Sequence, residues 1–491
     1  MNPLIATFAC ACGIVGLFYL DRGKATRVSK SLWLPILWIV VIGSRPISSW
    51  FQYDALKDTN GDGGLIDLAV FMILLAVAVT VLILRWKRTR LLLAWNLPIV
   101  LYFLYCLAST AWAYDPATSI KRWIKAIGDL AIVMVIVSEP RPAESLSRLA
   151  SWIGFIFFPT SLLLIKYFPL LGRGYSPDGM QMNTGVTLNK NMLGVLLLVI
   201  SLCTLWRTLT LLRTSDQSDR RRRLIAQYIL LACELILFHM ANSMTSLSCF
   251  ALGAGLMLAI NLRFFRRSSV RVHLLCFGVV LLGAFAFLLG AQGGVAQALG
   301  RDSTLSGRKE IWAAVIPAAP NAMIGAGFES FWDSPAAENF QRRMVGWWHP
   351  ENLNEAHNGY IEIYLNLGWL GICLITTILA TGYLRAVRTL RLDAHTGGLF
   401  LAYVVVSAVY SVTEAGFRML NPMWFFFLLG IVGASGINGG YFGEIVRRTQ
   451  TSRPDKGQKT LVTNRPGSTQ PDYVSREVMS PFRHARANNP R

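Results

Sequence analysis

Apolar residues are grouped into long runs that are separated by short charged segments. A run of about 20 apolar residues is long enough to cross a lipid bilayer as an α-helix. Runs of this kind predict about thirteen spanning helices, within a range of about 12 to 14. They lie near residues 4–20, 32–49, 65–84, 91–113, 120–138, 151–169, 191–206, 224–241, 245–262, 272–290, 357–384, 398–413 and 420–437. The pattern therefore predicts an all-α polytopic membrane protein.

The positive charge is concentrated on one side of the predicted membrane. The chain has 47 Lys and Arg against 27 Asp and Glu, although only 15% of its residues are charged and the mean hydropathy is +0.44. The cations occur in alternate connections, such as Arg85–Arg90 and Arg220–Arg223, whereas 50–64 has three aspartates and one lysine. Cytoplasmic loops are rich in Lys and Arg, so we expect the N-terminus outside and the C-terminus in the cytoplasm. The cations form no patch with interleaved aromatic residues, so nucleic acid is not an expected partner.

The same pattern divides the chain into four regions. Residues 1–290 are expected to form N-terminal membrane helices, 291–356 a large outer loop, 357–437 C-terminal membrane helices and 438–491 a disordered, basic cytoplasmic tail. The first apolar run lacks a basic n-region and a small-residue cleavage site, so we interpret it as a retained span. The eight cysteines lie in apolar segments without CxxC spacing, which argues against a zinc site or a disulfide framework.

The outer loop 291–356 is long enough to be functional. Ser306 is a candidate N-cap, so a helix is expected to begin there and to carry Arg308 in its first turn. The free N–H groups and the dipole of a helix start favour an anion, and a guanidinium beside them suits phosphate. The alternative is a surface arginine paired with Glu310 or Asp302.

The loop ends in a histidine. On a continuous helix His357 would share one face with Tyr360, and a histidine at the outer mouth of a membrane helix can stay neutral near pH 7 and accept a proton. The alternative is a capping or interfacial histidine. These residues are candidates for catalysis and for substrate binding.

A second outer segment, 170–190, places cations on the side of the membrane where cations are scarce. Arg173 and Lys190 lie next to a helix expected to begin at Asn191, and Asn189 and Asn191 could either cap that helix or contact a ligand. Glu414 borders the membrane at the outer end of the twelfth predicted span, where an ionisable residue suggests a functional role.

No metal site is expected from the sequence. Asp58–Gly63 matches the opening of a calcium-binding EF-hand loop, but the twelfth position, where a bidentate glutamate is required, is Ala69. We therefore interpret this segment as a turn.

Four segments resemble the O-antigen ligase/O-antigen polymerase family: SGRKEIW at 306–312, GAGFESFW at 325–332, AHNGY at 356–360 and NKNMLG at 189–194. The resemblance covers about 170–440 and is nearest to the branch that polymerises succinoglycan-type exopolysaccharide. Ligase-like members often carry Arg or Lys where this chain has Met244. This departure favours a polymerase over a ligase.

The resemblance implies a class C glycosyltransferase fold with a large periplasmic loop in the inner membrane, without a metal or a cofactor. The implied donor is a glycan on undecaprenyl diphosphate. The implied acceptor is a lipid A core sugar for a ligase, or another lipid-linked repeat for a polymerase. By this resemblance His357 is the base, and Arg308 and Arg173 bind the diphosphate. Membrane lipids and other polysaccharide assembly and export proteins are further expected partners.

The sequence leaves two other classes of function open. A flippase for lipid-linked oligosaccharide should show polar residues along a path through its spans, yet Glu234 and Lys125 are the main mid-span charges in the sequence. A scaffold for polysaccharide export would give no reason for Arg308 and His357 to lie at one loop mouth.

Overall fold

The computed structural model describes residues 2–22, 29–51, 64–175, 179–213, 219–291, 306–343 and 354–439. All described residues belong to the first of the two units into which the chain divides, Met1–Val446. The predicted tail 438–491 therefore lies almost wholly outside the described residues. The last described helix ends at Asn438, one residue inside that predicted tail.

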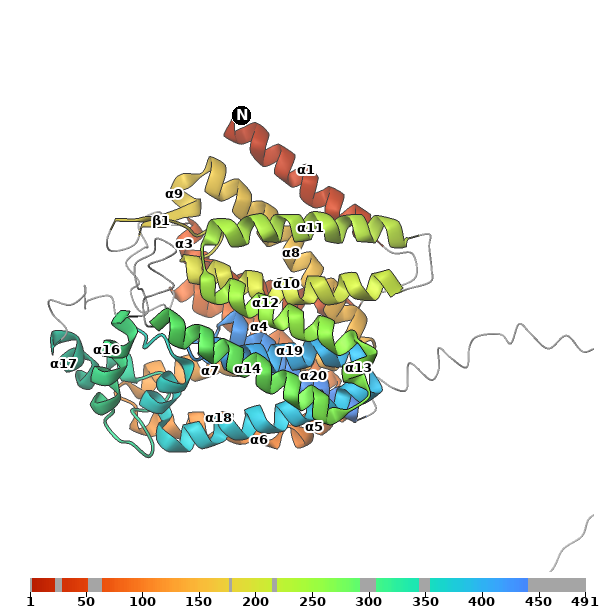
Figure 1. Ribbon diagram of the computed structural model, residues 1–491. Helices are drawn as coiled ribbons and strands as arrows, with labels where there is room; N and C mark the ends of the chain where they lie inside the picture. The colour runs from red at the N-terminus through yellow and green to blue at the C-terminus, as the bar shows by residue number, and fades with distance from the viewer. Residues whose placement is uncertain are drawn as a thin grey trace, which may run out of the picture. The chain divides into compact units, whose positions relative to one another are not determined.

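The first unit is built from α-helices (Figure 1). In its N-terminal half these are α1 Pro3–Asp21, η1 Lys30–Leu32, α2 Trp33–Gly43, α3 Ile47–Phe51, α4 Leu65–Leu84, α5 Trp86–Trp95, α6 Leu97–Ser109, η3 Thr110–Trp112, α7 Pro116–Val137, α8 Pro142–Tyr167 and α9 Pro169–Gly172. Then follow α10 Lys190–Arg213, α11 Arg220–Ala241, α12 Met244–Asn261, α13 Arg263–Arg266, α14 Ser269–Ala291, α16 Ser306–Val315, η4 Ile316–Ala318, η5 Phe331–Asp333, α17 Pro335–Arg343, α18 Gly359–Leu392, α19 Ala394–Tyr410 and α20 Pro422–Asn438.

One small hairpin interrupts the helices. Strand β1, Arg173–Tyr175, pairs antiparallel with β2, Gln181–Asn183, and Gly174 lies opposite Met182. The hairpin gathers with α9, α16 and α17 at one end of the helices, which we call the loop end (at the left in Figure 1). The short helix α13 lies at the opposite end.

Each of the thirteen predicted apolar stretches coincides with a helix or a helix pair, so the prediction of an all-α polytopic membrane protein is confirmed. Within the described residues, seven helices are long and apolar enough to span a membrane: α1, α4, α8, α10, α11, α12 and α18. The pair α5 and α6, which bends by 87°, could form an eighth span. The expected number is larger because it also includes four shorter apolar helices and α7.

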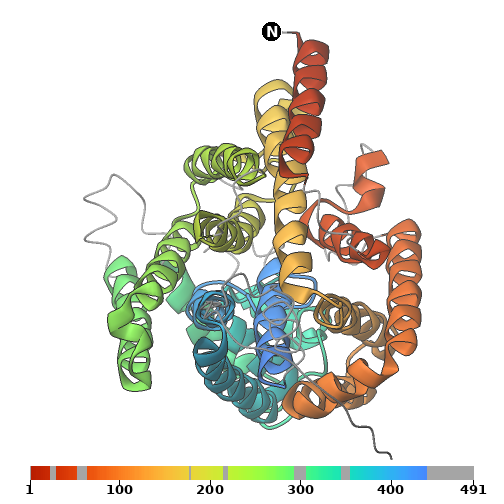
Figure 2. The ribbon, with the colours of Figure 1, turned by 90° about the vertical axis from the view of Figure 1, so that its right-hand side faces the viewer.

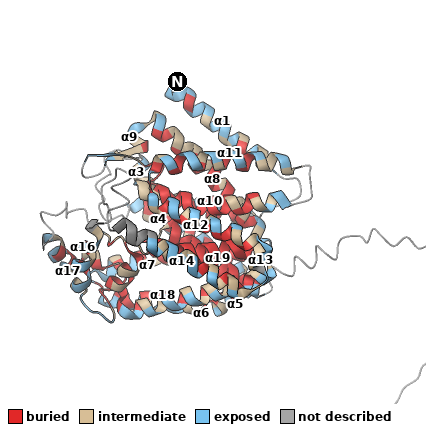
Figure 3. Ribbon diagram, in the orientation of Figure 1, coloured by how far each residue is buried: buried red, intermediate tan, exposed pale blue. Residues whose placement is uncertain are grey.

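Helices α10, α19 and α20 form the centre of the bundle, whereas α1 and α4 lie at its periphery. In the 18-residue apolar stretch of α10, 78% of the residues are buried within the protein, compared with 11% in that of α1 and 28% in that of α4. Figure 2 shows the blue helices α19 and α20 between the green helices and the orange helices, and Figure 3 shows the buried residues concentrated there. Helices packed between other helices lack a lipid-facing side. They hold the loop-end connections, including the one that carries Glu414, in place.

Small residues allow these helices to approach closely, as is usual in membranes. A Cβ added at Gly433 would lie 2.5 Å from the ring of Phe400, and one at Gly128 would lie 2.1 Å from the ring of Trp38. All eight cysteines are free, but only four of them are buried.

Besides Glu234 and Lys125, the helices bury further charged groups. Arg207 and Asp21 form a buried ion pair just beyond the ends of the predicted spans 191–206 and 4–20. Asp129 of α7 is also fully buried, and its carboxylate accepts hydrogen bonds from Trp38 Nε1 (2.8 Å) and from the backbone N–H of Leu420 (3.0 Å). These groups have partners on neighbouring helices and connections, so they join elements of the bundle together.

Candidate active site

The start of α18 is fixed to the connection between α19 and α20. Asn358 caps the helix, because its Oδ1 accepts from Tyr360 N (3.0 Å) and Ile361 N (3.1 Å). The N–H of Gly359 donates to the carbonyls of Ser411 (2.8 Å) and Glu414 (3.0 Å). The residue that precedes this cap, His357, is therefore held beside the connection that carries Glu414.

His357 lies before the start of α18 and not on the helix, so it does not share a helical face with Tyr360 as predicted. Its φ is +48°, in the left-handed region that non-glycine residues seldom adopt. Such strained residues cluster at active sites, where the surrounding structure holds them in place. Because the chain turns at His357, the imidazole points back between two carboxylates.

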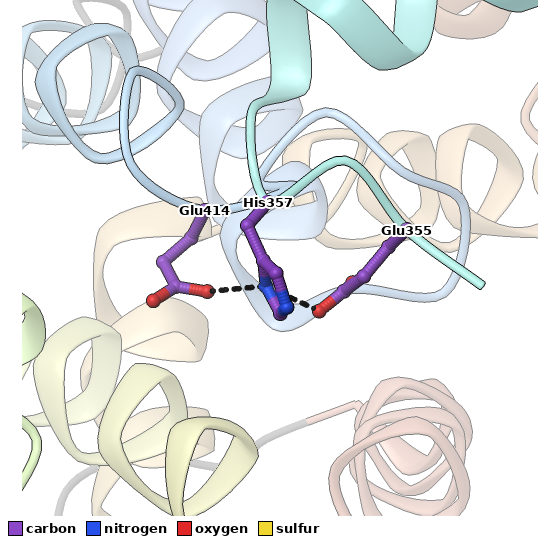
Figure 4. A group of neighbouring side chains, drawn as sticks. All are labelled: Glu355, His357 and Glu414. Atoms are coloured by element: carbon purple, nitrogen blue, oxygen red, sulfur yellow. Dashed lines mark ion pairs between the residues drawn. The ribbon is translucent and has the colours of Figure 1, made fainter. Parts of the chain in front are cut away.

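Those two carboxylates are Glu355 and Glu414 (Figure 4). The Nδ1 atom of His357 lies 2.8 Å from Oε1 of Glu355 and 3.6 Å from Oε2 of Glu414. The side chains of His357 and Glu355 are about one-third exposed, while Glu414 is buried. One nitrogen of the ring thus faces a pair of negative charges at the edge of solvent.

Arg308 reaches the same carboxylate from the loop. Its Nη2 lies 3.0 Å from Oε1 of Glu414, and its Nη1 donates to the carbonyl of Thr413. Helix α16 begins at Ser306, as predicted, which places Arg308 in its first turn. The partner of Arg308 is therefore Glu414, more than 100 residues away in the sequence. Of the two alternative partners, Glu310 forms no ion pair with Arg308 among the described residues, and Asp302 lies outside them.

The structure adds a second arginine that sequence reasoning missed. Arg418 Nε lies 3.2 Å from Oε2 of Glu329, and its Nη1 lies 3.9 Å from Oε2 of Glu355. Arg418 is a cation on the side where cations are scarce. The argument that selected Arg173 and Lys190 could therefore have selected it too.

The charged groups of the site form a chain of contacts in which negative and positive groups alternate. In spatial order the groups are Glu329, Arg418, Glu355, His357, Glu414 and Arg308. They come from the long loop, from the segment before α18 and from the α19–α20 connection. The cationic and anionic groups are equal in number when the histidine is protonated.

This arrangement sets the charge of the histidine. Burial alone would lower the pKa of His357, but the negative charges of Glu355 and Glu414 outweigh it and raise the pKa to about 10. Burial would raise the pKa of Glu355, but His357, Arg418 and Arg308 outweigh it and lower that pKa to about 2. The expectation that His357 stays neutral near pH 7 is therefore wrong for this geometry.

The loop is bound to the helices by its segment 325–333. The N–H of Ala326 donates to Leu365 O and that of Gly327 to Asn366 O, both at 2.9 Å. Asn366 Oδ1 accepts from the N–H groups of Ser330 (2.9 Å) and Phe331 (3.0 Å). The backbone beside Glu329 is thus fixed to α18.

Helix α7 holds the same segment from the other side. Arg122 donates to the carbonyl of Glu329 and forms an ion pair with Asp333, and Ser119 Oγ donates to Phe328 O at 2.6 Å. Glu329 itself has a φ of +49°. This part of the long loop is therefore a fixed wall of the site.

Glu362 supports the segment before the histidine. Its carboxylate accepts from Trp332 Nε1 (3.0 Å to Oε2) and from the N–H of Ala356. Glu362 is buried in the first turn of α18, so this contact joins the loop, the helix and the residue that precedes His357.

Tyr360 is another residue predicted to bind substrate. Tyr360 donates through its hydroxyl to Ala408 O (3.1 Å) and packs against the ring of Phe417, which are structural contacts. Its predicted role in substrate binding is not tested by these contacts.

The predicted cations of the second outer segment are not joined to His357. Helix α10 begins at Lys190, one residue earlier than expected, and Asn189 Oδ1 accepts from Met192 N (2.8 Å), as a helix cap does. Arg173 of β1 donates from Nε to Ile165 O at 2.9 Å. Across the ranges that the structure describes, no hydrogen bond or ion pair connects Arg173, Asn189, Lys190 or Asn191 with His357.

We assign no metal to this site, although three groups of the kind that bind metal ions lie together in it. Glu355, His357 and Glu414 each offer a ligand atom, and these atoms lie within 4.8 Å of one another. Both carboxylates already face guanidinium groups, which a metal ion would have to displace. The predicted absence of a metal remains a prediction.

Two comparisons with known proteins match part of this chain. Residues 229–376 match the family described as O-antigen ligase, and this range contains Arg308, Glu329, Glu355 and His357. The chain is also 29% identical over 174 residues to the exopolysaccharide production protein ExoQ of Rhizobium meliloti (strain 1021), which covers 34% of this chain and 38% of that protein. The resemblance expected from the sequence, to the O-antigen ligase family and to its exopolysaccharide branch, is confirmed over this part of the chain.

Proposed function

We propose that the protein is an inner-membrane polysaccharide polymerase or ligase that acts in exopolysaccharide or O-antigen biosynthesis. It transfers a glycan from undecaprenyl diphosphate to a sugar hydroxyl on the periplasmic face. The observation that carries this proposal is the meeting of His357 and Arg308 at Glu414, because a base and a cation are the two groups that the reaction requires. The proposal places the loop end and the N-terminus in the periplasm and the C-terminus in the cytoplasm.

The transfer requires one bond to break and one to form at the anomeric carbon. The acceptor oxygen attacks that carbon, the bond to the diphosphate oxygen breaks, and undecaprenyl diphosphate leaves with the bonding electrons. The acceptor proton passes to His357. Arg308 stabilises the negative charge on the leaving diphosphate, so this oxygen does not need a proton. Direct attack inverts the anomeric configuration.

The charge state of His357 limits this step at neutral pH. Because the pKa of His357 is raised well above 7, most molecules have a protonated imidazole at neutral pH, and only the minority with a neutral imidazole can accept the acceptor proton. A positioned base contributes a factor of about 10² to 10⁴ in rate, so this minority can carry the reaction. The rate of transfer should therefore increase with pH until the imidazole has lost its proton.

The second outer segment suits the sugar or phosphate part of a substrate. Lys190, with the amides of Asn189 and Asn191, offers charged and neutral donors at the start of α10, and Arg173 of β1 offers a further cation in the same outer segment. We assign them to substrate binding and not to the chemical step. The relative is named for exopolysaccharide production, and Met244 stands where ligase-like members often carry Arg or Lys. Both observations favour the polymerase over a ligase acting on lipid A core.

Complementation tests the proposal. Cells that lack the chromosomal copy of the gene would carry the full chain, or His357→Ala, Arg308→Ala or His239→Ala, the last being a control at an exposed histidine of α11. We expect the first two variants to lose high-molecular-weight polysaccharide and to accumulate single lipid-linked repeats, while the control resembles the wild type. Normal polymer in both variants would contradict the assignment. A product with retained anomeric configuration, measured by NMR, would contradict direct attack.

A further inference from the structure

Arg418 joins three separate segments of the site. From the α19–α20 connection it contacts the loop residue Glu329 (Nε to Oε2, 3.2 Å) and Glu355 (Nη1 to Oε2, 3.9 Å). Its Nη1 also donates to the carbonyl of Asn354 at 3.3 Å. Glu355 in turn is the nearer of the two carboxylates that face His357. One guanidinium thus holds both the side chain and the backbone of the segment that leads into the histidine.

These contacts differ from those of an ordinary surface ion pair. The side chains of Arg418 and Glu329 are 27% and 11% exposed, whereas the exposed pair Arg342–Glu338 in α17 has values of 70% and 63%. Exposed pairs contribute little, but a half-buried arginine with several carboxylate and carbonyl partners fixes their positions. Glu329 is itself fixed by Arg122.

We propose that Arg418 is a positioning residue for the transfer proposed above: it couples Glu329 of the loop to Glu355 and thereby sets how much negative charge Glu355 presents to His357. Arg418 acts through Glu355 and has no contact with the imidazole among the interactions described. The inference rests on the proposed function only where polysaccharide is measured, because the charge of the histidine can be measured without a substrate.

The geometry gives opposite signs for two substitutions. Glu355→Gln removes a negative charge 2.8 Å from His357 Nδ1, so the imidazolium loses stabilisation and the midpoint of its titration should fall. Arg418→Gln removes the cation that offsets Glu355, so the imidazolium gains stabilisation and the midpoint should rise. Arg418→Lys keeps the charge but loses the planar fork that contacts Glu329 and Asn354 together.

The first measurement follows exchange of the imidazole C2 hydrogen for deuterium, by mass spectrometry of the peptide that contains residue 357. This rate increases with pH through the titration midpoint of the ring. The full-length protein in detergent serves as the sample, and Arg342→Gln is the matched control for the loss of a cation. We expect a downward shift of about one pH unit or more for Glu355→Gln, an upward shift of about one unit for Arg418→Gln, and the wild-type midpoint for Arg418→Lys and the control. Equal midpoints in Arg418→Gln and the wild type would overturn the inference.

The second measurement separates this inference from the proposed function. In complemented cells we expect Arg418→Gln to reduce high-molecular-weight polysaccharide at least tenfold and Arg418→Lys to restore part of it. If the titration midpoints shift as expected but no variant of the site changes the polysaccharide, the positioning role stands and the proposed function fails. If polysaccharide depends on His357 but neither the midpoint nor the polymer responds to Arg418→Gln, the proposed function stands and the positioning role fails.

Discussion

Glu414 Oε1 lies 3.0 Å from Nη2 of Arg308, and this pair joins the long loop to the connection between α19 and α20. The other oxygen of the same carboxylate faces the imidazole of His357. A single buried carboxylate therefore orients a candidate phosphate-binding cation and influences the charge of a candidate base. It follows that the two functions should respond together to changes at Glu414.

Glu414→Gln should reduce transfer by about 10²-fold, because the amide keeps the shape but gives Arg308 no charged partner, and this loss outweighs the larger neutral fraction of His357. The measurement is the initial rate of polymer formation in membranes. Glu338→Gln removes a carboxylate from an exposed ion pair in α17 and should leave the rate unchanged. A wild-type rate in Glu414→Gln would show that Arg308 does not depend on this carboxylate.

Arg308→Lys should also be impaired, by about tenfold or more. The guanidinium contacts Thr413 O and Glu414 with two different nitrogens, and a lysine can offer only one ammonium on a flexible stem. The rate should be compared with that of Arg342→Lys, at an exposed arginine. If Arg308→Lys were as active as the wild type, Arg308 would contribute only a point charge.

The pH dependence of the rate distinguishes a base from a fixed cation at residue 357. A base must be unprotonated, so the rate should increase about tenfold per pH unit from neutral pH towards pH 10, where His357 loses its proton. In Glu355→Gln the pKa of His357 is lower, so the rising part of the profile should move towards neutral pH. A rate that decreases over the same range would show that the protonated histidine is the active form.

The sequence was sufficient to predict the helices. Lipid imposes a strong pattern, because every backbone group in the bilayer must be satisfied within a helix, and all thirteen apolar stretches lie on helices. Apolar runs alone do not tell how many of these helices cross the membrane. Helix α7 carries buried Arg122, Lys125 and Asp129, and its charges are compensated by partners that the sequence does not identify.

The site was predicted in part. Arg308, His357 and Glu414 could be found because each is an ionisable residue at an outer boundary. The pairing of Arg418 with Glu329, 89 residues away, depends on how the loop folds back onto α18. The charge of His357 could not be predicted either, because it follows from a left-handed backbone that turns the ring towards two carboxylates.

The break in α18 gives a prediction about stability. Gly368 has φ +64° and ψ −163°, a conformation almost restricted to glycine, and an added Cβ would lie 2.3 Å from the backbone of Met323. At this break the N–H groups of Trp369 and Leu370 donate to loop carbonyls at 2.9 and 3.1 Å. Gly368→Ala should therefore destabilise the protein by about 3 kcal/mol or more and release the loop.

Thermal unfolding in detergent, with protease sensitivity of the loop, measures this effect. Gly255→Ala in α12 is the matched control, because nothing lies within 4 Å of a Cβ added there. It should be neutral or stabilise the helix by up to about 1 kcal/mol, since alanine has the higher helix propensity. Equal unfolding temperatures for the two variants would mean that the loop does not depend on the break, and that His357 is positioned by the α19–α20 connection alone.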